Sequence, residues 1–355
     1  MNVAQEANIP YERKPGTIHS FFALKFHDGE EDRVKVEAIE KALNQAGVKI
    51  TLMARDVEKW GKAKIPESKT LMRDYAFPAM QRCDCNIIEF SEKGVGLGMN
   101  GGYCYAIGKP IYVIAKTGSD ISTTMANIAQ KIIFYDKPED LIKPFAEIAK
   151  NSPRVILASG SKYRKTKLET IGIPFEIMVS NVDEAPDQSK TPKDQLADIA
   201  MRKAKAVFEK TKYRGRRLII AADHNLMFEG KLYGKPKTIK EARDNIQAFR
   251  GSQNIYSYVG NAVLLADRDK ILQSINATDV SRLSMDNISN LEIEKFLKSG
   301  DWRQVCSGAN LNNALFVHTV EGHTSTAYGM TIEYAQELLP SLYSIWDYPK
   351  TSIRN

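Results

Sequence analysis

The sequence predicts an α/β protein with two consecutive domains. Short apolar runs alternate with amphipathic helical stretches along most of the chain, a pattern typical of sheets covered by helices. A length of 355 residues is too long for one ordinary core and suits two. Residues 150–153 form a polar, proline-containing joint between two such blocks. We therefore expect domains over residues 17–150 and 153–345, with flexible tails over residues 1–16 and 346–355.

Strands and helices alternate throughout the first block. Residues 31–46 illustrate a helix, because Val36, Ile39 and Leu43 lie on one helical face and Gly47 follows as a stop. Strands are expected over residues 17–26, 48–54, 86–90 and 109–115, and further helices over residues 68–82 and 94–107. The alternation predicts a doubly wound parallel sheet, flavodoxin-like or Rossmann-like, which would bind ligands at the carboxyl ends of its strands.

A glycine-rich turn follows the third expected strand, and it runs from Gly94 to Tyr103. With Arg73-Asp74 and Cys83-Asp84, this run resembles the nucleoside 2-deoxyribosyltransferase family and its relatives that hydrolyse deoxynucleoside monophosphates. The resemblance covers residues 17–149. It implies a nucleotide-binding domain whose substrate-binding residues are Asp74, Asp84, Gly96, Gly98 and Asn100.

Asn100 departs from that family, which has a glutamate at this position that attacks the sugar. An amide cannot act as the carboxylate nucleophile of glycosyl transfer. The sequence therefore predicts nucleotide binding without transferase activity. An alternative is a deoxynucleoside or deoxynucleotide glycosidic-bond enzyme in which Glu89 or Glu92 supplies the acid.

Two apolar strands in the second block run into residues suited to a polyphosphate. Residues 217–222 are apolar after Arg217 and deliver Asp223 at the expected strand end, with Lys235 following on a Gly-Pro turn. A carboxylate beside a cation is a common arrangement for a divalent metal and phosphates. An earlier expected strand is followed by Ser159, Ser161 and Arg164. Small residues at a helix start allow a phosphate to approach backbone amides, and arginine neutralises it.

The order and spacing of these motifs, together with residues 181–184 and 199–207, resemble the Maf family of nucleotide pyrophosphatases. The resemblance covers residues 153–342. It implies a Maf-like α/β domain with a mixed sheet, and hydrolysis of modified or non-standard nucleoside triphosphates with magnesium or manganese. Carried over by position, it implies metal binding by Asp223 and Glu184, catalysis by these two with Lys203 and Lys235, and substrate contacts by Ser159, Ser161, Arg164 and Asn310.

Four features depart from the Maf pattern. Tyr163 replaces the first of two arginines, His224 replaces a threonine, and Asn310 replaces a glutamine. The segment that begins at Gly251 lacks the family's Gly-Arg-x-His run. An amide at Asn310 still forms hydrogen bonds but reaches less far. These changes indicate either a different base specificity or a catalytically inactive nucleotide-binding or sensing protein.

The amino-acid composition limits the kinds of molecule that the protein is expected to bind. The net charge of +7 is modest and the basic residues are scattered, which argues against nucleic acid. No apolar run approaches membrane-spanning length. The four cysteines have neither disulfide-ladder nor zinc-site spacing, so we expect reduced thiols in a cytoplasmic protein. A nucleotide is the expected ligand, and the Maf resemblance implies a possible homodimer.

Overall fold

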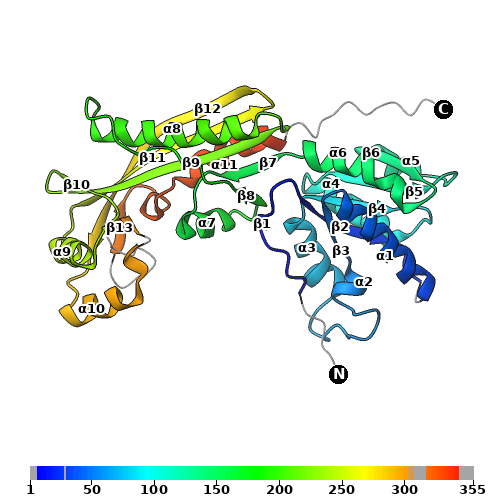
Figure 1. The fold of residues 1–355 in the computed structure, drawn as a ribbon. Helices are drawn as coiled ribbons and strands as arrows, with labels where there is room; N and C mark the ends of the chain where they lie inside the picture. The colour runs from blue at the N-terminus through cyan, green and yellow to red at the C-terminus, as the bar shows by residue number, and fades with distance from the viewer. Residues whose placement is uncertain (1–5, 28, 304, 307–316, 344–355) are drawn as a thin grey trace. The chain divides into compact units, whose positions relative to one another are not determined.

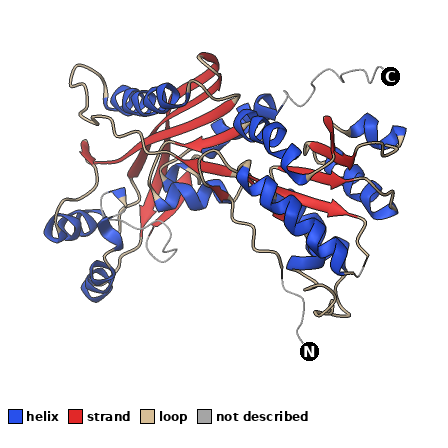
Figure 2. Cartoon of the chain, turned by 45° about the vertical axis from the view of Figure 1, so that its right-hand side comes forward, coloured by secondary structure: helices blue, strands red, loops and turns tan. Residues whose placement is uncertain are grey.

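The computed structural model describes residues 6–27, 29–303, 305–306 and 317–343 (Figure 1). Helices and strands are interspersed throughout, which confirms the predicted α/β class (Figure 2). Contacts within the chain divide it into two compact units. The first unit contains the described residues up to Pro153, Gly172–Glu176 and Tyr343, and the second contains Arg154–Ile171 and Ile177–Leu342.

The first unit contains a parallel sheet with the strand order β3-β2-β4-β5-β6. Every neighbouring pair in this sheet is parallel, which confirms the doubly wound prediction. The strands are β2 (Ile18–Leu24), β3 (Val48–Thr51), β4 (Cys85–Glu89), β5 (Ile111–Lys116) and β6 (Lys131–Tyr135).

Both faces of this sheet are buried by helices. On β2, Phe21 and Ala23 belong to one apolar cluster, whereas Phe22 and Leu24 belong to another. Because side chains alternate across a strand, the two clusters lie on opposite faces. The helical segments of this unit are α1 (Glu30–Gln45), α2 (Met53–Asp56), the π-helical turn η1 (Met72–Ala76), α3 (Phe77–Arg82), α4 (Val95–Ala106), α5 (Thr123–Ile128), η2 (Pro138–Leu141) and α6 (Ile142–Asn151).

Residues 6–16 correct the expectation of a tail over residues 1–16. β1 (Glu12–Arg13) pairs in parallel with the start of β8 (Phe175–Ile177), and Ile9 is 2 % exposed within an apolar cluster of the first unit. The polar sequence is misleading because the Arg13 guanidinium is buried against acceptors rather than solvated. Residues 1–5 and the expected tail over 346–355 lie outside the described residues.

Two elements of the first unit differ from their expected bounds. The strand expected over residues 48–54 ends at Thr51, because Asp56 accepts a hydrogen bond from the Leu52 amide and α2 begins at Met53. The helix expected over residues 68–82 begins at Met72 with a π-helical turn before α3. Local capping and turn geometry, rather than the apolar pattern, set both boundaries.

The second unit has a mixed sheet, as the Maf resemblance implied. β7 is parallel to β9, β9 is antiparallel to β11, and β11 is antiparallel to β12. β13 pairs with β12, and β10 pairs with β9, in both cases antiparallel. These strands are β7 (Arg154–Leu157), β9 (Arg217–Phe228), β10 (Lys231–Tyr233), β11 (Ile255–Asp267), β12 (Lys270–Met285) and β13 (Val317–Glu321).

Helix α8 (Pro192–Thr211) lies along β9 and β11 and carries Ala200, Ala204 and Val207 into an apolar cluster with both strands. The remaining helical segments are α7 (Lys162–Glu169), α9 (Ile239–Phe249), α10 (Asn290–Ser299), η3 (Asp301–Arg303), η5 (Thr326–Tyr328) and α11 (Ile332–Tyr343). None of the helices in the described part of the chain combines the length and apolar composition needed to cross a lipid bilayer.

Gly260 on β11 allows α8 to approach the sheet. A Cβ atom at this position would lie 2.1 Å from the carbonyl carbon of Leu196 and 2.5 Å from the amide nitrogen of Ala197. Both are backbone atoms, so neither can move without shifting the helix. Gly260 is also the register partner of Asp223 on β9. The glycine therefore sets the distance between α8 and the sheet at the position of that carboxylate.

Replacing Gly260 with alanine is expected to destabilise the second unit by roughly 3 kcal/mol, because overpacking against backbone forces the helix outward. Urea unfolding monitored by circular dichroism measures this change. Gly102→Ala on α4 is the control, since its Cβ would meet open space. A Gly260→Ala protein as stable as wild type would show that the close approach is not required.

Candidate functional site

The second unit contains a cavity of about 860 Å³ whose lining is rich in charge. Its walls come from the turn between β7 and α7, from α8, from β9 and from residues 328–329. Five cationic residues and two carboxylates line it: Lys162, Arg164, Lys203, Lys235 and Arg303, with Glu184 and Asp223. The excess of positive charge suits a polyanionic ligand.

Lys203 lies at the centre of the charged group. Its Nζ is 2.7 Å from Asp223 Oδ1 and 2.8 Å from Glu184 Oε2. The Lys203 side chain is 7 % exposed, the Asp223 side chain 16 % and the Glu184 side chain 60 %. A buried ammonium is stable only when counter-charges or acceptors surround it. The sequence predicted these three residues as site members, and the structure brings them together.

Asp223 lies in the middle of strand β9, not at its end. β9 is buried from Arg217 to Ala222 and becomes half-buried at Asp223. The expectation of a strand end at Asp223 is wrong, because β9 continues to Phe228 while paired to β11 and β10. Asp223 therefore projects from mid-strand, where its backbone is paired to β11 through Gly260.

The residues predicted to form a phosphate cradle lie together at the start of α7. Ser159 Oγ accepts hydrogen bonds from Arg164 Nη1 at 3.0 Å and from the Ser161 amide at 3.2 Å. Arg164 Nε donates to the carbonyl oxygen of Gly329 at 2.8 Å. Burial lowers the pKa of Arg164 from its usual range, while Asp223 and Glu184 oppose that shift. Ser159, Ser161, Arg164 and Lys235, all predicted from the sequence, line the same cavity.

His224 occupies the cavity wall beside Asp223. Its Nε2 lies 2.9 Å from Ser257 Oγ, whose hydroxyl donates to the carbonyl oxygen of Thr326. Burial, together with the charges of Arg164 and Lys235, lowers the pKa of His224 to about 3. A neutral imidazole therefore stands where the Maf pattern has threonine, and it is anchored rather than facing solvent.

Several residues that line the cavity could not be predicted as site residues from the sequence. Gly329 and Tyr328 reach the cavity from far along the chain, and Gln188, Gln195 and Cys306 also line it. Each depends on long-range packing that no local motif encodes. The aromatic part of Tyr163, which replaces an arginine of the Maf pattern, packs against an apolar cluster. Asn310 lies outside the described residues.

The donor set suits a metal that shares its coordination with a ligand. No group of three or more histidine, cysteine or acidic side chains that could hold a metal occurs among the described residues. Asp223 and Glu184 nevertheless offer two carboxylates around one point. Magnesium is usually held by one or two carboxylates, with substrate phosphates and water completing its octahedron. The residues present therefore fit such a cation in the company of a polyphosphate.

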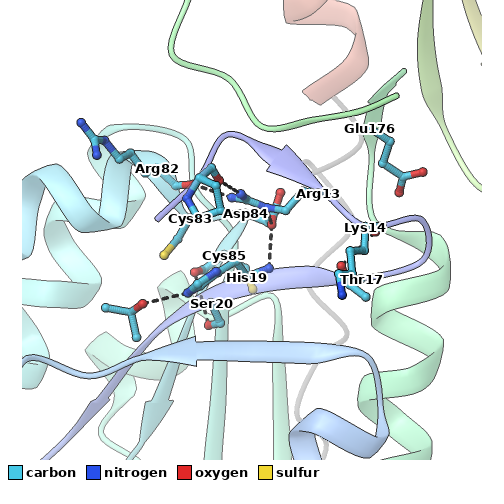
Figure 3. A network of polar contacts seen from close by, with 12 residues as sticks. Arg13, Lys14, Thr17, His19, Ser20, Arg82, Cys83, Asp84, Cys85 and Glu176 are labelled. Atoms are coloured by element: carbon cyan, nitrogen blue, oxygen red, sulfur yellow. Dashed lines mark hydrogen bonds and ion pairs between the residues drawn. The ribbon is translucent and has the colours of Figure 1, made fainter. Parts of the chain in front are cut away.

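Asp84 in the first unit lies apart from the glycine run, although the sequence predicts that both bind the substrate. It precedes β4, whereas Gly96, Gly98 and Asn100 follow that strand on α4. Five residues of strand span about 16 Å. Asp84 Oδ2 instead accepts hydrogen bonds from Arg13 Nε at 2.8 Å and from the His19 amide at 2.7 Å (Figure 3). It anchors β1 at the amino-terminal edge of the sheet.

The other predicted substrate-binding residues of the first unit differ from one another in their surroundings. Asp74 accepts a hydrogen bond from the Thr70 amide at 2.7 Å and pairs with Arg73, so it caps its own turn. Gly96 and Gly98 have open space at their Cβ positions. Asn100 Oδ1 is buried without a hydrogen-bond partner among the described residues. No further contact of these residues indicates a ligand.

The two acids considered as replacements for a sugar-attacking carboxylate are both engaged. Glu89 is 2 % exposed and accepts hydrogen bonds from Lys35 at 2.8 Å and Tyr135 at 3.1 Å. Glu92 pairs with Lys25 and His27. Hydrogen bonds from the Lys25 and His27 side chains stabilise the charged form of Glu92 and lower its pKa.

His19 makes the stability of the first unit sensitive to acid. Burial and the neighbouring charge of Arg13 lower its pKa from 6.5 to about 4. Because the unfolded chain binds a proton at higher pH than the folded one, this stabilisation is complete above pH 6.5 and declines as the pH falls towards 4. We predict a loss on the order of 2 kcal/mol over this interval.

Unfolding free energies of wild type and His19→Gln, measured at several pH values, test this prediction. Glutamine can still reach the Thr51 hydroxyl that lies 2.7 Å from His19 Nε2, but it does not titrate. The variant should therefore show the shallower slope. Equal slopes for the two proteins would contradict the assignment.

The geometry is a cation-lined cavity around two convergent carboxylates, an arrangement suited to a polyphosphate and a divalent cation. Comparison with known proteins identifies the family to which the chain belongs. Residues 154–342 match the model of the Maf-like proteins, and the chain belongs to this family.

Curated relatives each match about half of the chain. A dTTP/UTP pyrophosphatase of Bacillus cereus is 29% identical over 184 residues, which cover 51% of this chain and 86% of the relative. A dTTP/UTP pyrophosphatase of Bacillus anthracis is 29% identical over 181 residues, which cover 50% of this chain and 90% of the relative.

Two solved structures show weak likeness. A CMP N-glycosidase of Clostridium botulinum is 14% identical, with a TM-score of 0.26, covering 36% of this chain and 96% of that one. A nucleoside-triphosphatase, also described as a dITP/XTP pyrophosphatase, of Mycobacterium abscessus is 13% identical, with a TM-score of 0.24, covering 52% of this chain and 92% of that one. At these scores neither likeness supports a conclusion about this chain.

Proposed function

We propose that the second unit hydrolyses nucleoside triphosphates to nucleoside monophosphates and pyrophosphate with the help of a divalent cation. The observation that carries this proposal is the convergence of Asp223 and Glu184 on buried Lys203 inside a cation-lined cavity. Membership in the Maf-like family and relatives named dTTP/UTP pyrophosphatases support the same reaction.

Each group has a role in this proposal. Asp223 and Glu184 hold the cation, which supplies charge neutralisation and lowers the pKa of an attacking water. Arg164 and Lys235 hold phosphate oxygens, and Lys203 keeps the two carboxylates together while neutralising charge. Ser159 and Ser161 shape the cradle at the start of α7. Phosphoryl chemistry depends mainly on such positioning and electrostatic stabilisation.

The substrate proposed is a nucleoside triphosphate, with modified or non-standard bases included. Tyr163 and His224 line the cavity at positions that depart from the Maf pattern, so base preference need not follow the named relatives. We further propose that the first unit does not catalyse glycosyl transfer, because Asn100 offers an amide and both Glu89 and Glu92 are engaged. Nucleotide binding by this unit stays a prediction from the sequence. A cytoplasmic location and a homodimer stay predictions.

A pyrophosphate-release assay tests the proposed reaction. It uses purified full-length protein, common and modified nucleoside triphosphates, and magnesium or manganese. We expect turnover of at least one nucleotide and a decrease in kcat of about 100-fold or more in Asp223→Asn, because the cation that neutralises the transition-state charge would lose one of its two carboxylate ligands. Asp187→Asn is the control, an exposed carboxylate in the segment that also carries Glu184.

Two outcomes would contradict the assignment. If Asp223→Asn retains full activity while Asp187→Asn behaves like wild type, Asp223 does not have the role proposed. If the wild-type protein releases no pyrophosphate from any nucleotide but is thermally stabilised by some of them, the chain is a nucleotide-binding protein without turnover.

A further inference from the structure

Glu184 lies in a segment that has no helix or strand of its own. Residues 178–191 connect β8 to α8 in an irregular path. The Glu184 side chain is 60 % exposed, although its carboxylate reaches Lys203 Nζ. An irregular segment is ordered only by the contacts that offset its conformational entropy. The groups that hold Glu184 in place must therefore come from a neighbouring element.

Basic side chains of α8 provide these contacts. Arg202 Nη1 donates to the carbonyl oxygen of Asp183, and Arg202 Nη2 donates to the carbonyl oxygen of Ala185 at 2.8 Å. These two carbonyls flank Glu184, so one guanidinium restrains the backbone on both sides of it. Lys210 Nζ donates to the carbonyl oxygen of Ser180 at 2.8 Å and so holds the same segment farther from Glu184.

The Arg202 guanidinium is itself oriented. Asp198, one turn earlier on α8, accepts a hydrogen bond from Arg202 Nε at 3.1 Å, and its other oxygen accepts from Lys190 Nζ at 2.7 Å. The planar guanidinium presents its donors in fixed directions, which a lysine ammonium cannot reproduce. Asp198 therefore leaves both terminal nitrogens of Arg202 directed at the segment.

We propose that Arg202 is a positioning residue that sets the Glu184 carboxylate against Lys203, and thereby completes the pair of carboxylates that takes the divalent cation. Arg202 is not among the described residues that line the cavity, so it acts through Glu184 and not on the ligand. The inference rests on the proposed function in one respect, namely that Glu184 and Asp223 bind the cation together. Groups that orient metal ligands typically contribute 10- to 100-fold in metal affinity.

The experiment measures the Kd of Mn²⁺ by electron paramagnetic resonance, with the full-length protein and without nucleotide. Arg202→Met keeps the length of the side chain but removes its donors, and Arg202→Lys keeps the charge without the paired geometry. We expect a Kd about tenfold higher for Arg202→Met and an intermediate Kd for Arg202→Lys. Lys210→Met, which loosens the same segment elsewhere, should change the Kd less than about twofold.

A double-mutant cycle shows whether Arg202 acts through Glu184. Glu184→Gln should weaken Mn²⁺ binding by itself, and adding Arg202→Met to it should have no further effect, because the two changes remove the same contribution. Thermal unfolding of each variant establishes that the second unit remains folded. Hydrogen exchange over residues 183–187 should be faster in Arg202→Met than in Lys210→Met.

Three results would overturn the inference: an unchanged Kd in Arg202→Met, an equal weakening in Lys210→Met, or no Mn²⁺ binding by the wild-type protein. Failure of the proposed function is separate from these. A wild-type protein that binds Mn²⁺ in an Arg202-dependent manner but releases no pyrophosphate would retain the positioning role and lose the hydrolytic one.

Discussion

The ion pair between Lys203 and Asp223 joins the two elements on which the site of the second unit depends. Lys203 comes from α8 and Asp223 from β9, and their 2.7 Å contact exists only because α8 lies close to the sheet. Gly260, opposite Asp223 in the strand register, permits that approach. The same ammonium then binds Glu184 from a segment without regular structure. One buried cation thus fixes two carboxylates that would otherwise repel each other.

A second group of contacts holds residues 326–331 against the elements that surround the Lys203 ion pairs. The carbonyl oxygen of Gly329 accepts from Arg164, and that of Thr326 accepts from Ser257, the partner of His224. Asn261 on β11 exchanges hydrogen bonds with Thr331 and is 1 % exposed. Buried polar groups of this kind restrict a segment to one arrangement when each is satisfied. The wall of the cavity is therefore held independently of any ligand.

Local patterns explain which features could be predicted from the sequence. Asp223, Lys203 and Ser159 follow apolar runs or lie on a helix whose spacing is readable, and the structure brings them together. The sequence places Asp84 near the glycine run because only one short strand separates them, but the two ends of that strand lie at opposite ends of the sheet. The contacts of Arg13 and Arg202 were not predictable, since a surface arginine and one that binds distant carbonyls look alike in sequence.

Crystallographic analysis of the protein with Mn²⁺ and a slowly hydrolysed nucleoside triphosphate analogue tests the central claim most directly. The anomalous signal of manganese locates the cation without reference to the protein coordinates. The account predicts one manganese coordinated by Asp223 and Glu184, with phosphate oxygens beside Arg164 and Lys235. A manganese bound elsewhere, or a triphosphate outside this cavity while both carboxylates remain on Lys203, would contradict it.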